Sequence, residues 1–469
     1  MKLEEVENVL VNSGLNKSLK LGNIDLQKVS YNILKYREGG NGIYISGLRL
    51  TLFHIKEALE IIIQTISGRL YYILDSLHKW KYFIKKDVCL IKAGSIVDRF
   101  KDKSNKIFNS ISFIELSFLT KSNFLKSFKL FFNNDINYIP VYHLTISGIL
   151  SLYKYFVEYR KPFFNGLDGL NSYQKYSIEL YLIKMLLYRS WADSYAQVIV
   201  RRFQAKVYIF DVDQDRKFQM LADALNKLGQ QTVLLQHGIL TNPYLYIPTC
   251  RYMLCCSERE KKALIKSGIE PFRLKVIGSP VQTIIPEKFK LVPSTFKNKF
   301  LIIASGRIST QKTSYYIETI NSVNYKEYKT VVRLHPRSSN EIDQLWKKSF
   351  NDYAFDNYSD IFEQIQHSEI IITCSLDALI KCLYLRKPTI CVLTKEEYGS
   401  DKLSFLKDIS GLPISYDSKS HQENLNKIMD PDCRSGIAKK ELLYNFGEND
   451  IQKVSKNITS ALMNIFESR

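Results

Sequence analysis

Hydrophobic residues in the second half of the chain occur as short continuous runs separated by amphipathic segments. The first series of runs comprises residues 207–210, 232–235, 252–256 and 274–277. A short apolar run without polar alternation predicts a strand buried on both faces, as in a parallel sheet. The segments between the runs, 217–228 and 258–266, have helical periodicity and end at glycines, which are typical of helix C-termini.

A second series starts at Phe300. It has predicted strands at 301–304, 330–334, 370–373 and 388–392, and predicted helices at 361–366 and 377–384. Alternation of strands and helices on this scale predicts doubly wound parallel sheets. Residues 286–299 have the weakest apolar patterning between the two series and contain Pro286 and Pro293, which favours a linker. We therefore predict an N-terminal domain over 1–285 and a C-terminal domain over 286–469.

The N-terminal part of the chain has a different pattern. Up to about residue 135 it shows helical periodicity, with long apolar and basic stretches such as 50–80, and we predict a helical region there. Residues 118–132 interleave Phe and Leu with lysines. This segment is interpreted either as a surface helix that buries its Phe side or as a helix that lies on an anionic membrane.

Composition limits the classes of partner. The chain of 469 residues has 66 Lys and Arg against 47 Asp and Glu, a net charge of +19. This excess favours nucleic acid, an anionic membrane surface or a phosphorylated substrate, without choosing among them. The eight cysteines form no C-x-x-C pair and lie mostly in apolar runs, as core thiols do in a reducing compartment. With no signal-peptide core and no run of about 18 uncharged apolar residues, we expect a cytoplasmic protein, and peripheral attachment to the inner face of the membrane stays open.

The first motif with candidate chemistry is Gln236-His237-Gly238, directly after the predicted strand 232–235. Ligands of open parallel sheets bind beyond the carboxyl ends of strands. A neutral imidazole at His237 is a candidate general base, because its pKa is near neutral pH. Gly238 would let the backbone approach a ligand closely. The alternative is a histidine that only completes a turn.

The second motif is His335-Pro336-Arg337, at the end of the predicted strand 330–334. Proline makes the loop rigid, and the guanidinium is a permanent cation suited to the phosphates of a nucleotide. The alternative is a structural turn with a solvated arginine. Four further candidate nucleotide-binding positions share a place at the end of a predicted strand: Gly278, Ser279, Gly306 and Ser375.

Asp211, Asp213 and Asp215 alternate after a predicted strand. They are interpreted either as ligands of a divalent ion or as a solvated loop, and we favour the loop. Since the loop is favoured, we expect no metal. No G-x-G-x-x-G or G-x-x-x-x-G-K-[ST] fingerprint occurs, and we expect no cofactor.

Taken together, these motifs resemble bacterial capsule and surface-polysaccharide glycosyltransferases of the GT-B type. The nearest likenesses are capsule Kdo-transferases, sialyl- and polysialyltransferases and teichoic-acid glycerophosphotransferases, over about residues 207–414. The resemblance implies two Rossmann-like domains whose parallel sheets face a cleft. It also implies that His237 is the candidate base and that His335, Pro336 and Ser375 bind a cytidine nucleotide. The acidic motif of the sialyltransferases has no clear counterpart here.

The expected function is metal-independent transfer of a sugar from a nucleotide-sugar donor, CMP- or CDP-linked, to a surface glycan or glycolipid acceptor. A nucleotide-sugar epimerase or hydrolase would use the same kind of cleft and stays open as an alternative. A basic nucleic-acid-binding protein would explain the positive charge. Because no recognition motif supports that class, we expect no nucleic-acid partner.

Overall fold

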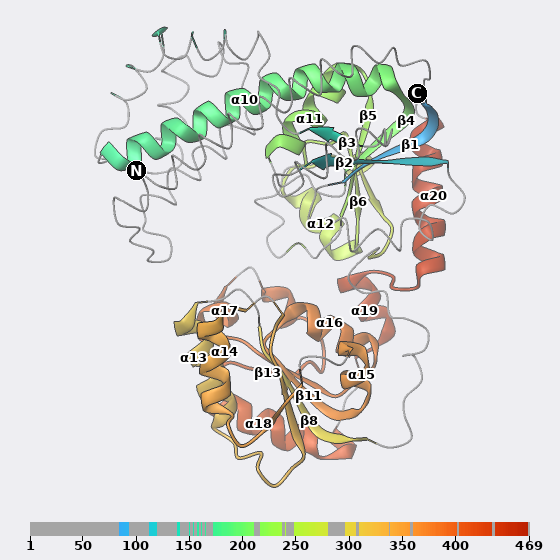
Figure 1. The fold of residues 1–469 in the computed structure, drawn as a ribbon. Helices are drawn as coiled ribbons and strands as arrows, with labels where there is room; N and C mark the ends of the chain where they lie inside the picture. Colours follow the sequence, from blue (N-terminus) through green and yellow to red (C-terminus); the bar gives the residue numbers. More distant parts are fainter. Residues whose placement is uncertain are drawn as a thin grey trace. The chain divides into compact units, whose positions relative to one another are not determined.

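The computed structural model describes residues 84–92, 112–119, 138–140, 172–210, 216–236, 248–279, 296–305, 309–336, 338–356, 360–400, 403–433 and 437–467, with residue 240 and a few single positions between 150 and 165. These residues form two parallel sheets with helices packed against them (Figure 1). No helix in these ranges combines the length and the apolar character that crossing a membrane requires.

The first sheet has the strand order β3-β2-β1-β4-β5-β6-β7. Its strands are β1 Ile84–Lys92, β2 Phe113–Leu119, β3 Tyr138–Pro140, β4 Phe203–Phe210, β5 Gln231–Leu235, β6 Tyr252–Cys255 and β7 Leu274–Val276. β1 and β4 pair in parallel, with Val88 opposite Val207. Because successive residues of β4 from Val207 to Phe210 are all buried, both faces of this strand are covered.

The helices that belong with this sheet are α10 Ser172–Arg202, α11 Arg216–Lys227 and α12 Glu258–Lys266, followed by the 3-10 turn η4 Pro271–Arg273. α10 packs on both α11 and β4. Arg189 of α10 is almost fully buried and forms ion pairs with Asp193 on its own helix and with Asp223 on α11. Buried charges are stable in a fold only when they are paired in this way.

The second sheet has the strand order β10-β9-β8-β11-β12-β13. Its strands are β8 Asn298–Ile303, β9 Thr330–Arg333, β10 Ala354–Phe355, β11 Ser368–Thr373, β12 Thr389–Val392 and β13 Ile414–Ser415. The helices of this part are α13 Thr310–Asn321, α14 Asn340–Ser349, α15 Ile361–Gln366, α16 Leu376–Tyr384, α17 Lys395–Gly399, α18 Ser418–Met429 and α19 Lys439–Phe446, with 3-10 turns η6 Ser404–Leu406 and η7 Pro431–Cys433. The last helix is α20 Ile451–Glu467.

Helices cover both faces of the second sheet (Figure 1). Alternate residues of β8 enter different cores: Phe300 and Ile302 join one cluster, and Leu301 and Ile303 join another. The first cluster is completed by Tyr316 of α13, Trp346 of α14 and Leu425 of α18, the second by Ile365 of α15 and Ala378 of α16. Each large apolar side chain buried here contributes about 1.5–3 kcal/mol, so the two cores fix the strands that carry the site.

Both sheets have the Rossmann strand order. In each, the first three strands run outward to one edge and the next strands run outward to the other, as in the order 3-2-1-4-5-6. The order reverses between β1 and β4 in the first sheet and between β8 and β11 in the second. The two Rossmann-like domains expected from the sequence are therefore confirmed.

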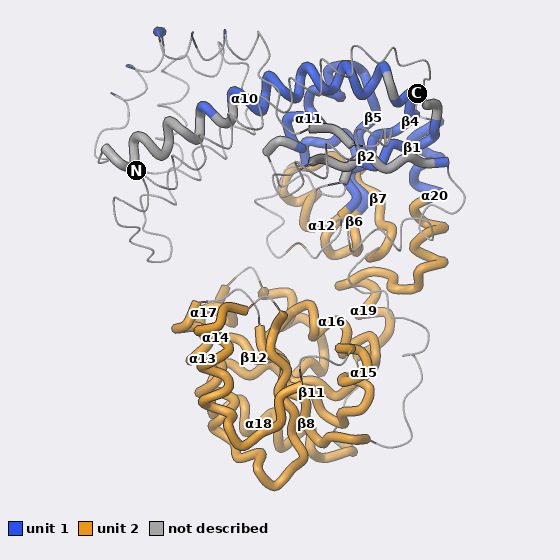
Figure 2. Tube along the Cα trace, viewed as in Figure 1, with its two compact units in different colours: residues 1–235, 247–254, 459–469 blue, residues 236–246, 255–458 orange. Residues whose placement is uncertain are grey.

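The chain separates into two compact units (Figure 2). One consists of residues 1–235, 247–254 and 459–469, the other of residues 236–246 and 255–458. Helix α20 contributes to both, since its residues up to Ile458 belong to the second unit. β7 ends at Val276, before the expected linker, and β8 begins at Asn298, inside the last residues of the range 286–299 expected for the linker. The domain boundary at 285/286 stays a prediction.

The structure corrects the expectation that the chain is helical up to residue 135. β1 and β2 lie in this part and pair with each other in the first sheet. The physical reason is visible in β1, where Val88 to Ile91 form a fully buried apolar run flanked by lysines. The amphipathic segment 118–132 begins inside β2, and its residues from 120 onward lie outside the described ranges.

Candidate functional site

Three neighbouring strands of the second sheet end at the same edge. The backbone N–H of Ala304 after β8 donates to the carbonyl of Arg333 at the end of β9, at 2.9 Å. The N–H of Cys374 after β11 donates to the carbonyl of Ile303, at 3.1 Å. These bonds continue the sheet one residue beyond its strands. The second residue beyond each of these strands therefore lies at the carboxyl edge; these residues are Ser305, His335 and Ser375. Ser305 and Ser375 follow the two strands between which the strand order reverses.

Ser375 is the N-cap of α16. Its hydroxyl oxygen accepts the N–H of Ala378 at 3.5 Å, and its own N–H donates to the Thr373 hydroxyl oxygen at 3.0 Å. These contacts aim the start of the helix at the carboxyl edge. A helix start carries a partial positive charge and attracts anions such as phosphate. Ser375 therefore has the capping role that local chemistry predicts, at a place where a phosphate would also be stabilised.

His335 is half-buried and begins the turn that leads into α14. Its carbonyl accepts hydrogen bonds from the backbone N–H of Ser338 at 3.0 Å and from the Ser338 hydroxyl at 2.7 Å. Pro336 is exposed within this turn, and Arg337 lies outside the described residues. These backbone hydrogen bonds are those expected if His335 belongs to a structural turn. The role of its imidazole in nucleotide binding stays a prediction.

A carboxylate that the sequence analysis did not consider lies at the same edge. Glu397 follows β12 in the first turn of α17, and it accepts the Thr394 N–H at 3.0 Å and the Tyr316 hydroxyl at 2.7 Å. It also forms an ion pair with Lys312. Burial alone would raise the pKa of Glu397, but Lys312 and these two donors lower it below its ordinary value. The capping-box spacing Thr394-x-x-Glu397 is the signal that would have identified it.

The Gln236-His237-Gly238 motif is described only at its first residue, and His237 and Gly238 lie outside the described residues. Gln236 is buried. Its side-chain amide donates to Glu260 Oε2 at 2.8 Å, and its side-chain oxygen accepts the Cys256 N–H at 3.1 Å. Leu240, beyond the motif, donates its N–H to Glu260 Oε1 at 2.8 Å. One carboxylate therefore holds the residues on both sides of 237–239.

Glu260 lies in the first turn of α12 and has no exposed surface. Burial raises its pKa, against the lowering effects of Arg259 and the hydrogen bonds just described. The Arg259 guanidinium lies 3.5 Å from Glu260 Oε1 and 3.9 Å from the centre of the Phe405 ring. The neighbouring Glu258 is exposed. The capping-box spacing Ser257-x-x-Glu260, at the start of a predicted helix, is the sequence signal that would have identified Glu260.

Gly278 and Ser279 lie against the segment that follows α19. The Ser279 N–H donates to the Glu448 carbonyl at 2.9 Å, and Ser279 is buried. Gly278 has φ +93°, and a Cβ built on it would lie 2.6 Å from the Glu448 oxygen. These contacts explain a glycine at 278 by close approach of another backbone. The part of both residues in nucleotide binding stays a prediction.

Two further expected features fall outside the described residues. These are Gly306, expected at the nucleotide site, and the alternating carboxylates Asp211, Asp213 and Asp215. Within the described ranges, no group of three or more His, Cys, Asp and Glu side chains is arranged to hold a metal ion. The seven described cysteines are buried and form no disulfide, as core thiols are expected to do.

No model of a known protein family matches the chain, and no curated protein matches its sequence. Solved structures resemble its fold. A UDP-N-acetylglucosamine 2-epimerase aligns with a TM-score of 0.50 and 10% identity over 82% of this chain and 98% of that one. The UDP-GlcNAc 2-epimerase of Neisseria meningitidis bound to UDP-GlcNAc aligns with a TM-score of 0.47 and 13% identity, over 81% of this chain and 100% of that one.

A glycosyltransferase from Rickettsia africae ESF-5 aligns with a TM-score of 0.48 and 13% identity, over 82% of this chain and all of that one. At such identities a likeness extends to the fold alone. The structure with the TM-score of 0.50 supports an α/β fold of the GT-B kind, with two parallel sheets. The resemblance to capsule-type transferases stays a prediction.

Proposed function

We propose that this chain is an enzyme that acts on a nucleotide-linked sugar, and that it binds the nucleotide at the carboxyl edge of the second sheet. The observation that carries the proposal is the reversal of strand order between β8 and β11. In open α/β sheets, ligands bind beyond the carboxyl ends of the strands at such a reversal. Ser305 and Ser375 are the second residues beyond the two strands that flank it, and His335 follows the next strand.

The chemistry of these residues suits phosphate. The N-terminal end of α16 behind Ser375 favours negative charge, and His335 with Arg337 adds donors and a cation. When the bond between a sugar and its nucleotide breaks, negative charge grows on the departing phosphate. Donors fixed in advance at that oxygen lower the barrier. Pro336 and Gly306 complete the proposed nucleotide site, while Gly278 and Ser279 are kept as candidates.

The first candidate reaction changes the sugar of the nucleotide-sugar without a separate acceptor, as in an epimerase. It is favoured because the structure aligned with the TM-score of 0.50 is a UDP-N-acetylglucosamine 2-epimerase. In this reaction the nucleotide is a uridine diphosphate, rather than the cytidine nucleotide that the resemblance to capsule-type transferases implied.

The second candidate is glycosyl transfer, which is favoured by the Gln236-His237-Gly238 motif and the buried anchor beside it. The anomeric carbon would lose its bond to the phosphate oxygen and form a bond to an acceptor oxygen. The proton of the acceptor hydroxyl would pass to His237, and the nucleotide would leave with the phosphate charge stabilised at the second sheet.

The test separates the two reactions by their need for an acceptor. The full chain is incubated with UDP-GlcNAc, and separately with CMP- and CDP-linked sugars, and the products are followed by proton NMR. A nucleotide-sugar with altered ring-proton couplings, formed without an acceptor, supports the epimerase. Free nucleotide that appears only when an oligosaccharide acceptor is added supports the transferase. Turnover of none of these compounds contradicts the proposal.

Variants at the two histidines connect the reaction to the site. We expect His335→Ala and His237→Ala each to lower turnover by about a hundredfold or more, the usual size of a lost transition-state donor or general base. Lys347→Ala, which removes an exposed cation from α14, is the matched control and should leave turnover unchanged. Turnover at the wild-type rate in both histidine variants would overturn the assignment of the site.

A further inference from the structure

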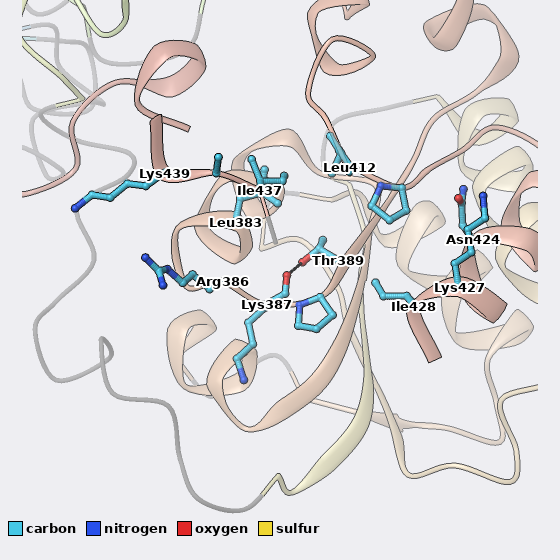
Figure 3. A pocket seen from close by; sticks show the side chains of 14 residues that line it. Leu383, Arg386, Lys387, Thr389, Leu412, Asn424, Lys427, Ile428, Ile437 and Lys439 are labelled. Carbon is cyan, nitrogen blue, oxygen red and sulfur yellow. Dashed lines mark hydrogen bonds between the residues drawn. The ribbon is translucent and has the colours of Figure 1, made fainter. Parts of the chain in front are cut away.

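A cavity of the second unit lies at the opposite edge of the second sheet, at the amino ends of its strands. Its volume is about 760 Å³, and it is lined by residues at the amino ends of two strands, Pro388 and Thr389 at β12 and Pro413 before β13 (Figure 3). His335 and Ser375 follow the carboxyl ends of their strands and are not part of it. The volume lies in the range of about 300–1,000 Å³ that small-molecule sites occupy.

The lining of this cavity, which we name the basic pocket, carries positive charge. Its ionisable residues are Arg386, Lys387, Lys427 and Lys439, and none of the described residues that line it is Asp or Glu. The cations come from separate elements: the turn after α16, helix α18 and the first position of α19. Cations from distant parts of the sequence are thus gathered around one cavity.

Lys387 has an internal role. Its ammonium donates to the Gln366 carbonyl at 2.6 Å and to the Ser368 carbonyl at 3.0 Å, and it lies 4.5 Å from the centre of the Phe296 ring. Burial lowers its pKa to about 8. Because these groups already engage Lys387, we assign ligand binding to the other three cations.

Those three cations have no carboxylate partner among the described residues. In the same unit, Lys312 pairs with Glu397, Lys381 with Asp377 and Lys395 with Asp417. No described carboxylate lies within ion-pair distance of Arg386, Lys427 or Lys439. In Figure 3, Arg386 and Lys439 extend toward the same side of the basic pocket, and Lys427 lies beside Asn424 on the other.

The start of α19 adds to the positive potential. Ala438, which lines the basic pocket, is the N-cap of this eight-residue helix and offers no side-chain cap. A helix start without a capping side chain leaves N–H groups that an anion satisfies well. The nearby carboxylate of Glu441 is engaged by the Ser410 N–H at 2.7 Å.

The backbone of Arg386 is the strongest local sign that its side chain matters. Arg386 has φ +55°, and among the described residues no other non-glycine has a positive φ. The position ends α16, where glycine is the usual residue because a Cβ is disfavoured in this conformation. An unfavourable backbone retained with a long cation in place of glycine points to a use for the cation.

We propose that the basic pocket binds a phosphate-bearing ligand of small-molecule size, with Arg386 and Lys439 on one side of the ligand and Lys427 on the other. Guanidinium binds phosphate through two parallel hydrogen bonds, and ammonium groups add point charges. The phosphate belongs either to a soluble phosphorylated compound or to a lipid headgroup. This site is separate from the nucleotide site and does not rest on the proposed reaction.

The competing explanation is electrostatic compensation of helix ends. Lys427 lies in the last turn of α18, and Arg386 follows the last turn of α16. Cations at these places stabilise the negative ends of helices. In that case the substitutions would lower thermal stability without changing anion affinity, which would overturn the proposal.

The experiment measures binding of inorganic pyrophosphate to the full chain by calorimetry. Arg386→Gly with Lys427→Gln removes two of the cations, and glycine suits the backbone at 386. Lys347→Gln with Lys348→Gln removes two exposed cations from α14 and is the charge-matched control. We expect saturable binding to the wild type, a loss of about tenfold or more in the pocket variant, and little change in the control.

A single Lys439→Gln variant gives a second measurement and should also weaken binding. Equal affinities of the pocket and control variants, or no saturable binding to the wild type, would overturn the proposal. Sedimentation with vesicles of equal parts phosphatidylglycerol and phosphatidylcholine then identifies the source of the phosphate. Vesicle binding that pyrophosphate displaces, and that only the pocket variants lose, assigns a lipid headgroup. Pyrophosphate binding without pocket-dependent vesicle binding assigns a soluble ligand.

Discussion

The carboxylate of Glu260 accepts hydrogen bonds from both sides of residues 237–239. Gln236 and Leu240 each donate to one of its oxygens at 2.8 Å, and Arg259 lies beside it. A carboxyl that is buried at a cost in desolvation, and yet satisfied by several donors, fixes the backbone that it contacts. Glu260 is therefore the residue that anchors the segment carrying His237.

We expect Glu260→Ala to lower the free energy of unfolding by about 3 kcal/mol, because two buried donors lose their acceptor at about 1–3 kcal/mol each. Denaturant unfolding gives the size of the effect, and faster hydrogen exchange at the Leu240 amide localises it. The exposed neighbour provides the control, since Glu258→Ala should change stability by no more than about 0.5 kcal/mol. An unchanged Leu240 exchange rate would contradict the anchoring role.

His421 predicts how stability depends on pH. Its Nε2 lies 2.6 Å from the Tyr325 hydroxyl and its Nδ1 lies 3.2 Å from the Ser415 hydroxyl. Burial lowers the pKa of His421 to about 4, against about 6.5 in an unfolded chain. Between these two pH values the unfolded state therefore binds more protons than the folded state. The contribution of His421 to the free energy of unfolding is fully present above about pH 6.5 and is lost as the pH falls toward 4.

We expect the free energy of unfolding of the second sheet to fall by about 2 kcal/mol between pH 7 and pH 5 from the titration of His421 alone. The free energy is measured from the slowest hydrogen exchange in β11, whose amides exchange only when the core opens. His421→Gln should remove this part of the pH dependence while leaving that of the carboxylates. Equal pH dependence of the wild type and the variant would show that His421 does not titrate in this range.

At the scale of elements, glycines allow the end of α19 and the segment after it to pass close to Cys256 and Gly278. Gly447 ends α19 with φ +86°, and a Cβ built there would lie 1.8 Å from the Cys256 carbonyl oxygen. Gly268 ends α12 with φ +94°, and a Cβ built there would meet nothing within 4 Å. The two positions share a positive φ and differ in the space around them.

This pair separates two costs of replacing glycine. Gly268→Ala should lower the free energy of unfolding by about 1 kcal/mol, the cost of a positive φ. Gly447→Ala should cost about 3 kcal/mol or more, since the backbone around Cys256 must also move. Urea unfolding of both variants checks the difference, and equal losses would mean that the close approach relaxes without cost.

The hydrophobic pattern predicted the strands in which every successive residue is buried. The runs at 207–210 and 370–373 are strands in which every successive residue is buried, and the helix expected over 258–266 begins at Glu258 with Ser257 as its N-cap. β13 was missed, since two residues carry no periodicity. β1 was missed because its buried run has only the residues from Val88 to Ile91 and is flanked by lysines. The strands that pair with it, β2 and β4, are not visible in such a local pattern.

The candidate site could be predicted only in part. Ser375 and His335 were found because each follows an apolar strand, and topology places them at one edge of the second sheet. Glu260 and Glu397 were missed because their significance lies in partners distant in sequence, such as Gln236 and Lys312. A sequence shows a capping spacing, but the fold decides whether the carboxylate caps its own helix or binds another segment.

At the scale of the whole molecule, one compact unit contains both the anchor at Glu260 and the carboxyl edge of the second sheet. The same unit contains the basic pocket at the opposite edge. The net charge of +19 gives the chain a general attraction for anions. A test of nucleotide recognition must therefore separate selective binding from this attraction.

A nucleotide panel makes that separation. A ligand present at about 100 times its Kd stabilises the folded state by about 2.7 kcal/mol, and it does so only where it binds. We expect UDP to raise the thermal midpoint and to slow hydrogen exchange at Ser305, His335 and Ser375 in an epimerase, whereas CMP or CDP should do so in a transferase of the expected class. Pyrophosphate is the control for charge, since it should protect the basic pocket around Lys427. Equal protection at the carboxyl edge by all four anions would show that charge alone, without recognition of a base or ribose, accounts for binding there.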